Sequence, residues 1–222
     1  MNRLYLVRHG ENVANLTKEF SSRRVDYSLT EKGVLQAQQT AMALAGQDIH
    51  EIFSSPLKRA RETAEIIGEH LGLPVTVVDE FREIDVGDLE LRPPTAEAWA
   101  YHNEVLTGWV TGHPERRFPG GDNYYTLTAR MRAGLKRITA GKDDCTLLVV
   151  GHGGIFVMTL PDLVPGVDLE WLFRTGSHNC SISQILLDGH RDGGHLQAEL
   201  VEWGSCAHLS GEAARLVSGL PD

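Results

Sequence analysis

Two histidines stand in the same local setting in this sequence. His9 follows the apolar run from Leu4 to Val7 and precedes a glycine, and His152 follows a second apolar run with a glycine on each side. An imidazole can act as a nucleophile, donate to an anion or exchange a proton near neutral pH. A lone histidine after a strand is more often structural, but two in matching positions favour a shared functional edge.

Two arginines are expected at the same edge as the histidines. Arg8 directly precedes His9, and Arg59 falls in the first turn of an expected helix that begins at Ser55-Pro56, a good N-cap and first helical position. The amide-rich start of a helix attracts anions. A solvated basic face would explain the neighbours Lys58 and Arg61, whereas Arg59 is expected at the sheet edge. The residue types therefore indicate an anion site.

Strands alternate with helices along the chain. The apolar runs ending at positions 7 and 150 are typical of buried parallel strands. The patterns predict strands over residues 4–7, 49–53, 75–78, 146–150, 182–187 and 196–203, and helices over 30–44, 55–71, 95–110, 125–138 and 155–160. This alternation predicts an α/β fold with a mainly parallel sheet, in which ligands bind at the carboxyl ends of the strands.

Length and charge limit the classes of protein to consider. The 222 residues predict one domain, with two still open, and residues 85–124 are rich in proline and glycine, as in an insertion or lid over the sheet edge. A formal net charge of -9 argues against a nucleic-acid partner. Three widely spaced cysteines, without a signal or membrane segment, indicate reduced thiols and a cytoplasmic location.

Several segments together resemble the histidine phosphatase superfamily, which includes the cofactor-dependent phosphoglycerate mutases. The resemblance covers roughly residues 3–188, and its segments come in the family's order: Leu6-Val7-Arg8-His9-Gly10-Glu11 with Asn15, Leu29-Thr30-Glu31-Lys32-Gly33, Ser54-Ser55-Pro56-Leu57 with Arg59, Phe81-Arg82-Glu83-Ile84 with Gly87, Val150-Gly151-His152-Gly153-Gly154, and Asn179-Cys180-Ser181-Ile182. A bare Arg-His-Gly is common by chance, but this ordered set is highly specific. It implies a three-layer α/β/α sandwich, phosphoglycerate mutase-like, with a lid insertion.

The resemblance also implies a chemistry for these residues. His9 would attack phosphorus and form a phosphohistidine, while Arg8, Asn15, Arg59, His152 and Gly153 would bind the phosphoryl oxygens. Glu83 would donate a proton to the leaving oxygen and later accept one from water. The substrate would be a small phosphomonoester, and neither a metal nor another cofactor would be needed. The oligomeric state is not readable from the sequence.

Two alternatives to a phosphatase stay open. A mutase would return the phosphoryl group to its substrate, although the insertion is short for a mutase and the segment around Glu83 resembles the phosphatase branches. A non-catalytic phospholigand-binding protein would be expected to lack His9 or Glu83, and both are present.

Two segments depart from the family's usual pattern. Many members carry an aromatic-Glu-Gly run after Gly87, where this chain has Asp88-Leu89-Glu90-Leu91, and many carry Gly-Glu-Ser where it has Gly121-Asp122-Asn123. Both departures are expected beside the substrate pocket, so they leave the substrate class open.

Two groups of side chains have an ambiguous role. Arg23, Arg24 and Tyr27 either reach the rest of the substrate or belong to a solvated loop. The aromatic residues at positions 99, 101, 109, 124 and 125 either line a lid or, as is more common for aromatics, form the insertion's own core.

Overall fold

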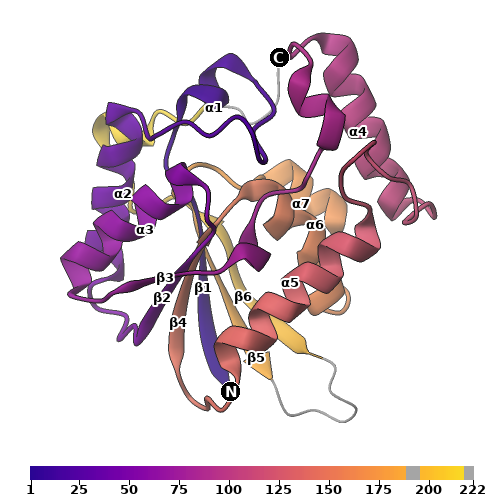
Figure 1. Cartoon of the computed structure of the whole chain (residues 1–222). Helices are drawn as coiled ribbons and strands as arrows, with labels where there is room; N and C mark the ends of the chain where they lie inside the picture. The colour runs from indigo at the N-terminus through magenta and orange to yellow at the C-terminus, as the bar shows by residue number, and fades with distance from the viewer. Residues whose placement is uncertain (189–195, 218–222) are drawn as a thin grey trace.

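The computed structural model describes residues 1–188 and 196–217 and contains a six-stranded sheet at its centre (Figure 1). The strands are β1 (Asn2–Arg8), β2 (Glu51–Ser54), β3 (Val75–Val77), β4 (Thr146–Gly151), β5 (Ile182–Asp188) and β6 (Gln197–Ser205). Their order across the sheet is β3-β2-β4-β1-β5-β6. The predicted strands are therefore all present, with small changes at their ends.

Parallel pairing brings two strand ends to one edge. β1 and β4 are parallel neighbours, with Arg8 opposite Gly151, so the residues that follow them lie side by side. β2 is parallel to β3 and β4, whereas β5 is antiparallel to β1 and β6. The start of β5 thus reaches the same edge, since Ile182 pairs with Val7.

Helices cover both faces of this sheet, as the resemblance implied. Helices α2 (Glu31–Leu44) and α3 (Lys58–Leu71) lie on one face, and α5 (Tyr124–Thr139), α6 (Gly153–Leu163) and α7 (Leu169–Thr175) lie on the other (Figure 1). Tyr5 and Val7 belong to the apolar cluster of the first face, while Leu4 and Leu6 belong to the larger cluster of the second. The alternation of side chains along a strand therefore supplies both cores from one apolar run.

The insertion packs against the segment that follows the nucleophile candidate. It contains a 3₁₀ helix, Gly87–Leu91, and α4 (Ala96–Val110), while the short α1 (Val13–Thr17) belongs to the opposing segment. Phe20 stacks near Trp99 with ring centroids 4.5 Å apart, and Trp109 is buried against Phe118. These rings mostly form a core of the insertion, as aromatics usually do, although Tyr125 is exposed.

The sequence misplaced one helix start and missed two helices, the short α1 and α7. α3 begins at Lys58 rather than at Ser55-Pro56, and its N-cap residue is Leu57. Helix α7 was not expected, although the Asp168 side chain caps it by accepting from the N–H groups of Glu170 and Trp171. Within residues 1–188 and 196–217, no helix has the length and apolar character required to cross a membrane.

Candidate active site

His9 lies just past β1 with its ring orientation fixed by two hydrogen bonds. Its Nδ1 is 2.7 Å from the Gly10 carbonyl oxygen, and the Nε–H of Arg59 donates to its Nε2 at 3.0 Å. A carbonyl can only accept, so Nδ1 carries the proton and Nε2 keeps a lone pair. The side chain is buried, and the backbone N–H of His9 donates to the Gly151 carbonyl. The ring is therefore held as a neutral imidazole with a defined basic nitrogen.

His152 lies beside His9, as the matching strand ends predicted. The two ring centroids are 5.2 Å apart, and His152 is fully buried. Its Nε2 is 2.7 Å from the Ser55 hydroxyl oxygen, while its Nδ1 has no hydrogen-bond partner in the described part of the chain. Such a buried, unsatisfied nitrogen is unusual in proteins and suits a site that binds a ligand.

Two arginines surround the histidine pair. The Arg59 guanidinium donates to the hydroxyl and the carbonyl of Ser21 at 2.9 and 2.7 Å, and Arg8 donates to the Ser177 carbonyl. The Nε of Arg8 is buried without a partner among the described residues. Burial lowers the pKa of Arg59 to about 10, against the opposing charges of Glu83 and Asp26. Both side chains therefore remain cations near neutral pH.

The environment of the histidines keeps them uncharged. Burial lowers the pKa of His9 well below its ordinary value of 6.5, and the charges of Arg59 and Arg8 lower it further. Burial and the same arginines, together with His9, also lower the pKa of His152 well below 6.5. The site thus combines neutral imidazoles with permanent cations.

The Glu83 side chain reaches the start of α6 from the segment that precedes the insertion. Its carboxylate oxygens accept from the N–H groups of Gly154 and Ile155 at 3.0 and 2.8 Å. Its charge raises the pKa of Arg8 and Arg59 against the effect of burial, which places it within electrostatic reach of both arginines. A Cβ atom on Gly154 would lie only 2.7 Å from Glu83 Oε1, so glycine is needed for this approach.

Asn15 and Gly153 complete the predicted set. The Asn15 Oδ1 accepts from the Asn12 N–H and from Asn179 Nδ2 at 3.1 and 3.0 Å, which leaves its amide group as the donor. A Cβ atom on Gly153 would lie 3.4 Å from Arg8 Cδ, so this glycine packs directly against the arginine. The structure thus brings five of the seven predicted residues together at one sheet edge through the contacts His9–Arg59, His9–His152 and Arg8–Gly153. Glu83 acts on both arginines through its charge, and Asn15 is linked to the His9 carbonyl through Asn179.

The family model described as "Histidine phosphatase superfamily (branch 1)" matches residues 4–199. The chain belongs to this superfamily. The resemblance inferred from the ordered motifs is confirmed, and so is the fold that it implied.

Relatives of the chain within this superfamily carry both mutase and phosphatase names. The chain is 32% identical to the "Probable phosphoglycerate mutase GpmB" of Erwinia tasmaniensis over 83% of this chain and 85% of the relative. It is also 32% identical to the "Uncharacterized phosphatase PhoE" of Bacillus subtilis, over 83% and 88% of the two chains. Among solved structures, a mycobacterial glucosyl-3-phosphoglycerate phosphatase complexed with VO3 is 26% identical with a TM-score of 0.75, over 92% of this chain and all of that one.

Several residues that support the candidate site were not predicted. Ser21 holds Arg59, Ser55 contacts His152, and Asn179 donates from Nδ2 to the His9 carbonyl at 3.0 Å. Arg130 donates to the backbone carbonyl of Glu83 at 3.2 Å and is paired with Asp122 at 3.0 Å. Ser55 and Asn179 lie within the family motifs quoted above, whereas Ser21 and Arg130 gave no local signal, because their contacts join distant segments.

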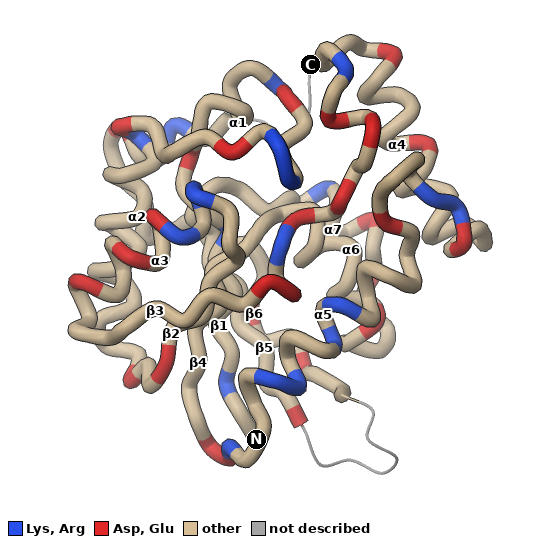
Figure 2. The backbone as a smooth tube through the Cα atoms, in the orientation of Figure 1, with Lys and Arg blue, Asp and Glu red and all other residues tan. Residues whose placement is uncertain are grey.

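No group of three or more His, Cys, Asp or Glu residues with the arrangement of a metal site occurs in the described ranges. Charges of both signs are distributed along the tube in Figure 2.

Proposed function

We propose that this protein hydrolyses phosphomonoesters through a phosphohistidine intermediate on His9. The observation that carries the proposal is the hydrogen bond from Nδ1 to the Gly10 carbonyl, which leaves a neutral Nε2 next to Arg59 and His152. A neutral imidazole nitrogen surrounded by fixed donors is the arrangement that nucleophilic phosphoryl transfer needs.

In the first step, the lone pair of His9 Nε2 forms a bond to phosphorus as the ester P–O bond breaks. Before this attack, as the phosphoryl group binds, Arg59 exchanges its hydrogen bond with Nε2 for one with a phosphoryl oxygen, which frees the lone pair. Arg8, Asn15, His152 and the backbone N–H of Gly153 supply further donors, and the unsatisfied nitrogens of Arg8 and His152 support this assignment. These groups offset the negative charge of the transferring phosphoryl group.

Glu83 supplies the proton in the same step. In its protonated form it donates to the leaving oxygen, so an alcohol departs instead of an alkoxide. Its carboxylate then accepts a proton from water as the water oxygen attacks phosphorus and the P–N bond breaks. Inorganic phosphate leaves, and His9 and protonated Glu83 are restored, so the cycle balances without a metal.

A second candidate is phosphoglycerate mutase activity, which the name of the Erwinia tasmaniensis relative favours. It would use the same first step but return the phosphoryl group to the departing acid. The mycobacterial phosphatase of similar structure, with its VO3 complex, favours hydrolysis.

The test is phosphate release from a panel of phosphomonoesters in EDTA, comparing the wild type with His9→Ala and with the exposed control His70→Ala. We expect metal-independent release that His9→Ala abolishes, and an alkali-stable phosphoprotein that only the wild type and the control form. Interconversion of 2- and 3-phosphoglycerate without net release would establish the mutase instead. Absence of both activities would indicate a protein that only binds phosphorylated ligands.

A further inference from the structure

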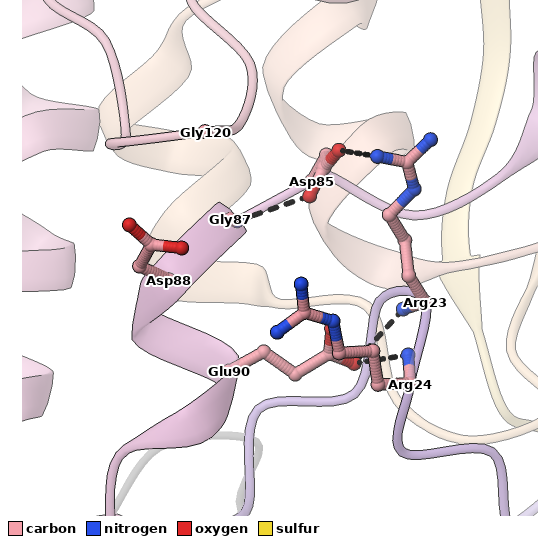
Figure 3. A pocket seen from close by; sticks show the side chains of 7 residues that line it. All are labelled: Arg23, Arg24, Asp85, Gly87, Asp88, Glu90 and Gly120. Carbon is pink, nitrogen blue, oxygen red and sulfur yellow. Dashed lines mark hydrogen bonds and ion pairs between the residues drawn. The ribbon is translucent and has the colours of Figure 1, made fainter.

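A cavity of about 270 Å³ opens between the segment after His9 and the start of the insertion. Figure 3 shows its charged lining, and the residues that matter here are Arg23, Arg24, Asp85, Asp88, Glu90 and Gly120. The cavity is linked to the candidate phosphate site from both sides. Arg24 comes three positions after Ser21, which holds Arg59, so their Cα atoms are at most about 11 Å apart. Asp85 comes two positions after Glu83.

Three of the charged side chains are already neutralised by contacts within the protein. Arg23 pairs with Asp85 at 2.9 Å, and Asp85 also accepts from the Gly87 N–H at 3.0 Å. The Glu90 Oε1 accepts from four successive backbone N–H groups at 2.7 to 3.1 Å. These groups form the walls of the cavity, and their hydrogen bonds and ion pair within the protein leave them little capacity to bind a ligand.

Two charges are left over, one of each sign. The Arg24 guanidinium and the Asp88 carboxylate are exposed, and no hydrogen bond or ion pair of either side chain occurs among the described residues. Figure 3 shows the Arg24 side chain directed into the cavity, with Asp88 on the far wall. Gly120 adjoins that wall, where a Cβ atom would make an ordinary van der Waals contact with Asp88 Oδ1 at 3.5 Å.

We propose that this cavity is the subsite for a zwitterionic leaving group, with Arg24 binding a carboxylate and Asp88 binding an ammonium group. The inference deepens the proposed hydrolysis and rests on it, and it names the substrate class as phosphate esters of hydroxy amino acids. A purely anionic leaving group would be repelled by Asp88, and a purely cationic one by Arg24. A neutral group would leave both charges without a partner, which costs free energy on desolvation.

Four phosphate esters test the binding of the carboxylate and of the ammonium group separately. O-phosphoserine carries both the carboxylate and the ammonium group, 3-phosphoglycerate carries only the carboxylate, O-phosphoethanolamine carries only the ammonium group, and glycerol 3-phosphate carries neither. We expect the wild type to have its highest kcat/KM for O-phosphoserine. Hydrolysis of p-nitrophenyl phosphate serves as the reference activity, because its leaving group has neither a carboxylate nor an ammonium group.

The variants assign each charge to its residue. Arg24→Gln should lower kcat/KM about tenfold or more for the two carboxylate esters and leave the other two within about twofold. Asp88→Asn should do the same for the two ammonium esters. Arg61→Gln, which removes an exposed arginine on α3, is the matched control and should change none of the four values.

The outcomes distinguish the subsite from the hydrolysis. Equal losses for all four esters, or a wild type that prefers glycerol 3-phosphate, would overturn the subsite while the hydrolysis stands. The same holds if p-nitrophenyl phosphate is hydrolysed and none of the four esters is. A wild type that releases phosphate from no ester at all would overturn the proposed function and the subsite together.

Discussion

At His9, the protein uses hydrogen bonding and burial for separate purposes. The Gly10 carbonyl selects the tautomer, because it can accept only from a protonated Nδ1. Burial and the two arginines then keep Nε2 unprotonated by lowering the pKa. The same cations that would bind phosphate therefore also maintain the proposed nucleophile in its reactive form.

This arrangement predicts a pH dependence of stability. The unfolded chain takes up protons on His9 and His152 as the pH falls below about 6.5, whereas the folded protein does not, because both pKa values are lowered. The free energy of unfolding is therefore unaffected by these histidines above about pH 6.5 and decreases below it. The free energy of unfolding should fall by up to about 1.4 kcal/mol per pH unit for each histidine until its folded pKa is reached.

Denaturant unfolding at pH 7.5 and pH 5 measures this loss. The double variant His9→Asn/His152→Asn lacks both titrations and should lose less stability between these pH values than the wild type. His102, whose pKa burial also lowers, remains in both proteins and accounts for part of the residual slope. Equal slopes for the two proteins would show that the active-site histidines do not resist protonation.

Among the elements, the 3₁₀ helix Gly87–Leu91 acts on the site through Glu90. Burial raises the pKa of Glu90, but the four backbone N–H bonds from Ser22 to Val25 outweigh it and lower the pKa overall. The carboxylate therefore holds the segment next to Ser21, which in turn holds Arg59. Glu90 is a positioning residue in this arrangement.

Substitution Glu90→Gln should loosen that segment. We expect the free energy of unfolding to fall by about 1–3 kcal/mol, because a charged acceptor of several hydrogen bonds is lost. Amide hydrogen exchange at residues 22–25 should accelerate, and kcat/KM should fall as Arg59 loses its support. Glu97→Gln, an exposed acid on α4, is the control. Unchanged exchange at residues 22–25 would contradict the role of Glu90.

The sequence predicted the strands whose apolar runs supply the cores on the two faces of the sheet. It did not predict features that depend on contacts between distant segments. β1 and β4 were predictable because their apolar runs supply both faces of the sheet. The start of α3 was predicted wrongly from Ser55-Pro56, a typical capping pair. In the fold, the Ser55 hydroxyl contacts His152 and accepts from the Leu57 N–H, so it stabilises a turn that precedes the helix.

In the candidate site, too, residues with a local pattern were predictable and contacts between distant positions were not. His9, Arg59, Glu83 and His152 could be selected because each follows or opens an element at the sheet edge. The bonds from Glu90 to residues 22–25 could not, because they join positions more than 60 residues apart without a local pattern. Leu89 and Leu91 beside Glu90 even suggested a departure from the family.

For the whole molecule, ligand binding should be coupled to unfolding. The proposed phosphate site is assembled from the end of β1, from α1 and α3, from the start of α6 and from Glu83 just before the insertion, so it exists only in the folded protein. A ligand that binds only the folded state stabilises it by about 2.7 kcal/mol at one hundred times its dissociation constant.

Inorganic phosphate should therefore raise Tm of the wild type in a concentration-dependent way. Arg61→Gln should show the same shift, and Arg59→Met should show little or none, whatever its own starting Tm. Sodium chloride at equal ionic strength controls for general salt effects. An equal shift in Arg59→Met would place the bound phosphate elsewhere.

The position of β1 in the sheet has a consequence for synthesis of the protein on the ribosome. β1 is the first strand to be made, yet its two neighbours are β4 and β5, which come about 140 and 180 residues later. At typical translation rates of about 5–20 residues per second, its apolar side chains wait on the order of ten to forty seconds for their partners. The nascent chain should therefore depend on chaperones, and truncations before β5 should aggregate.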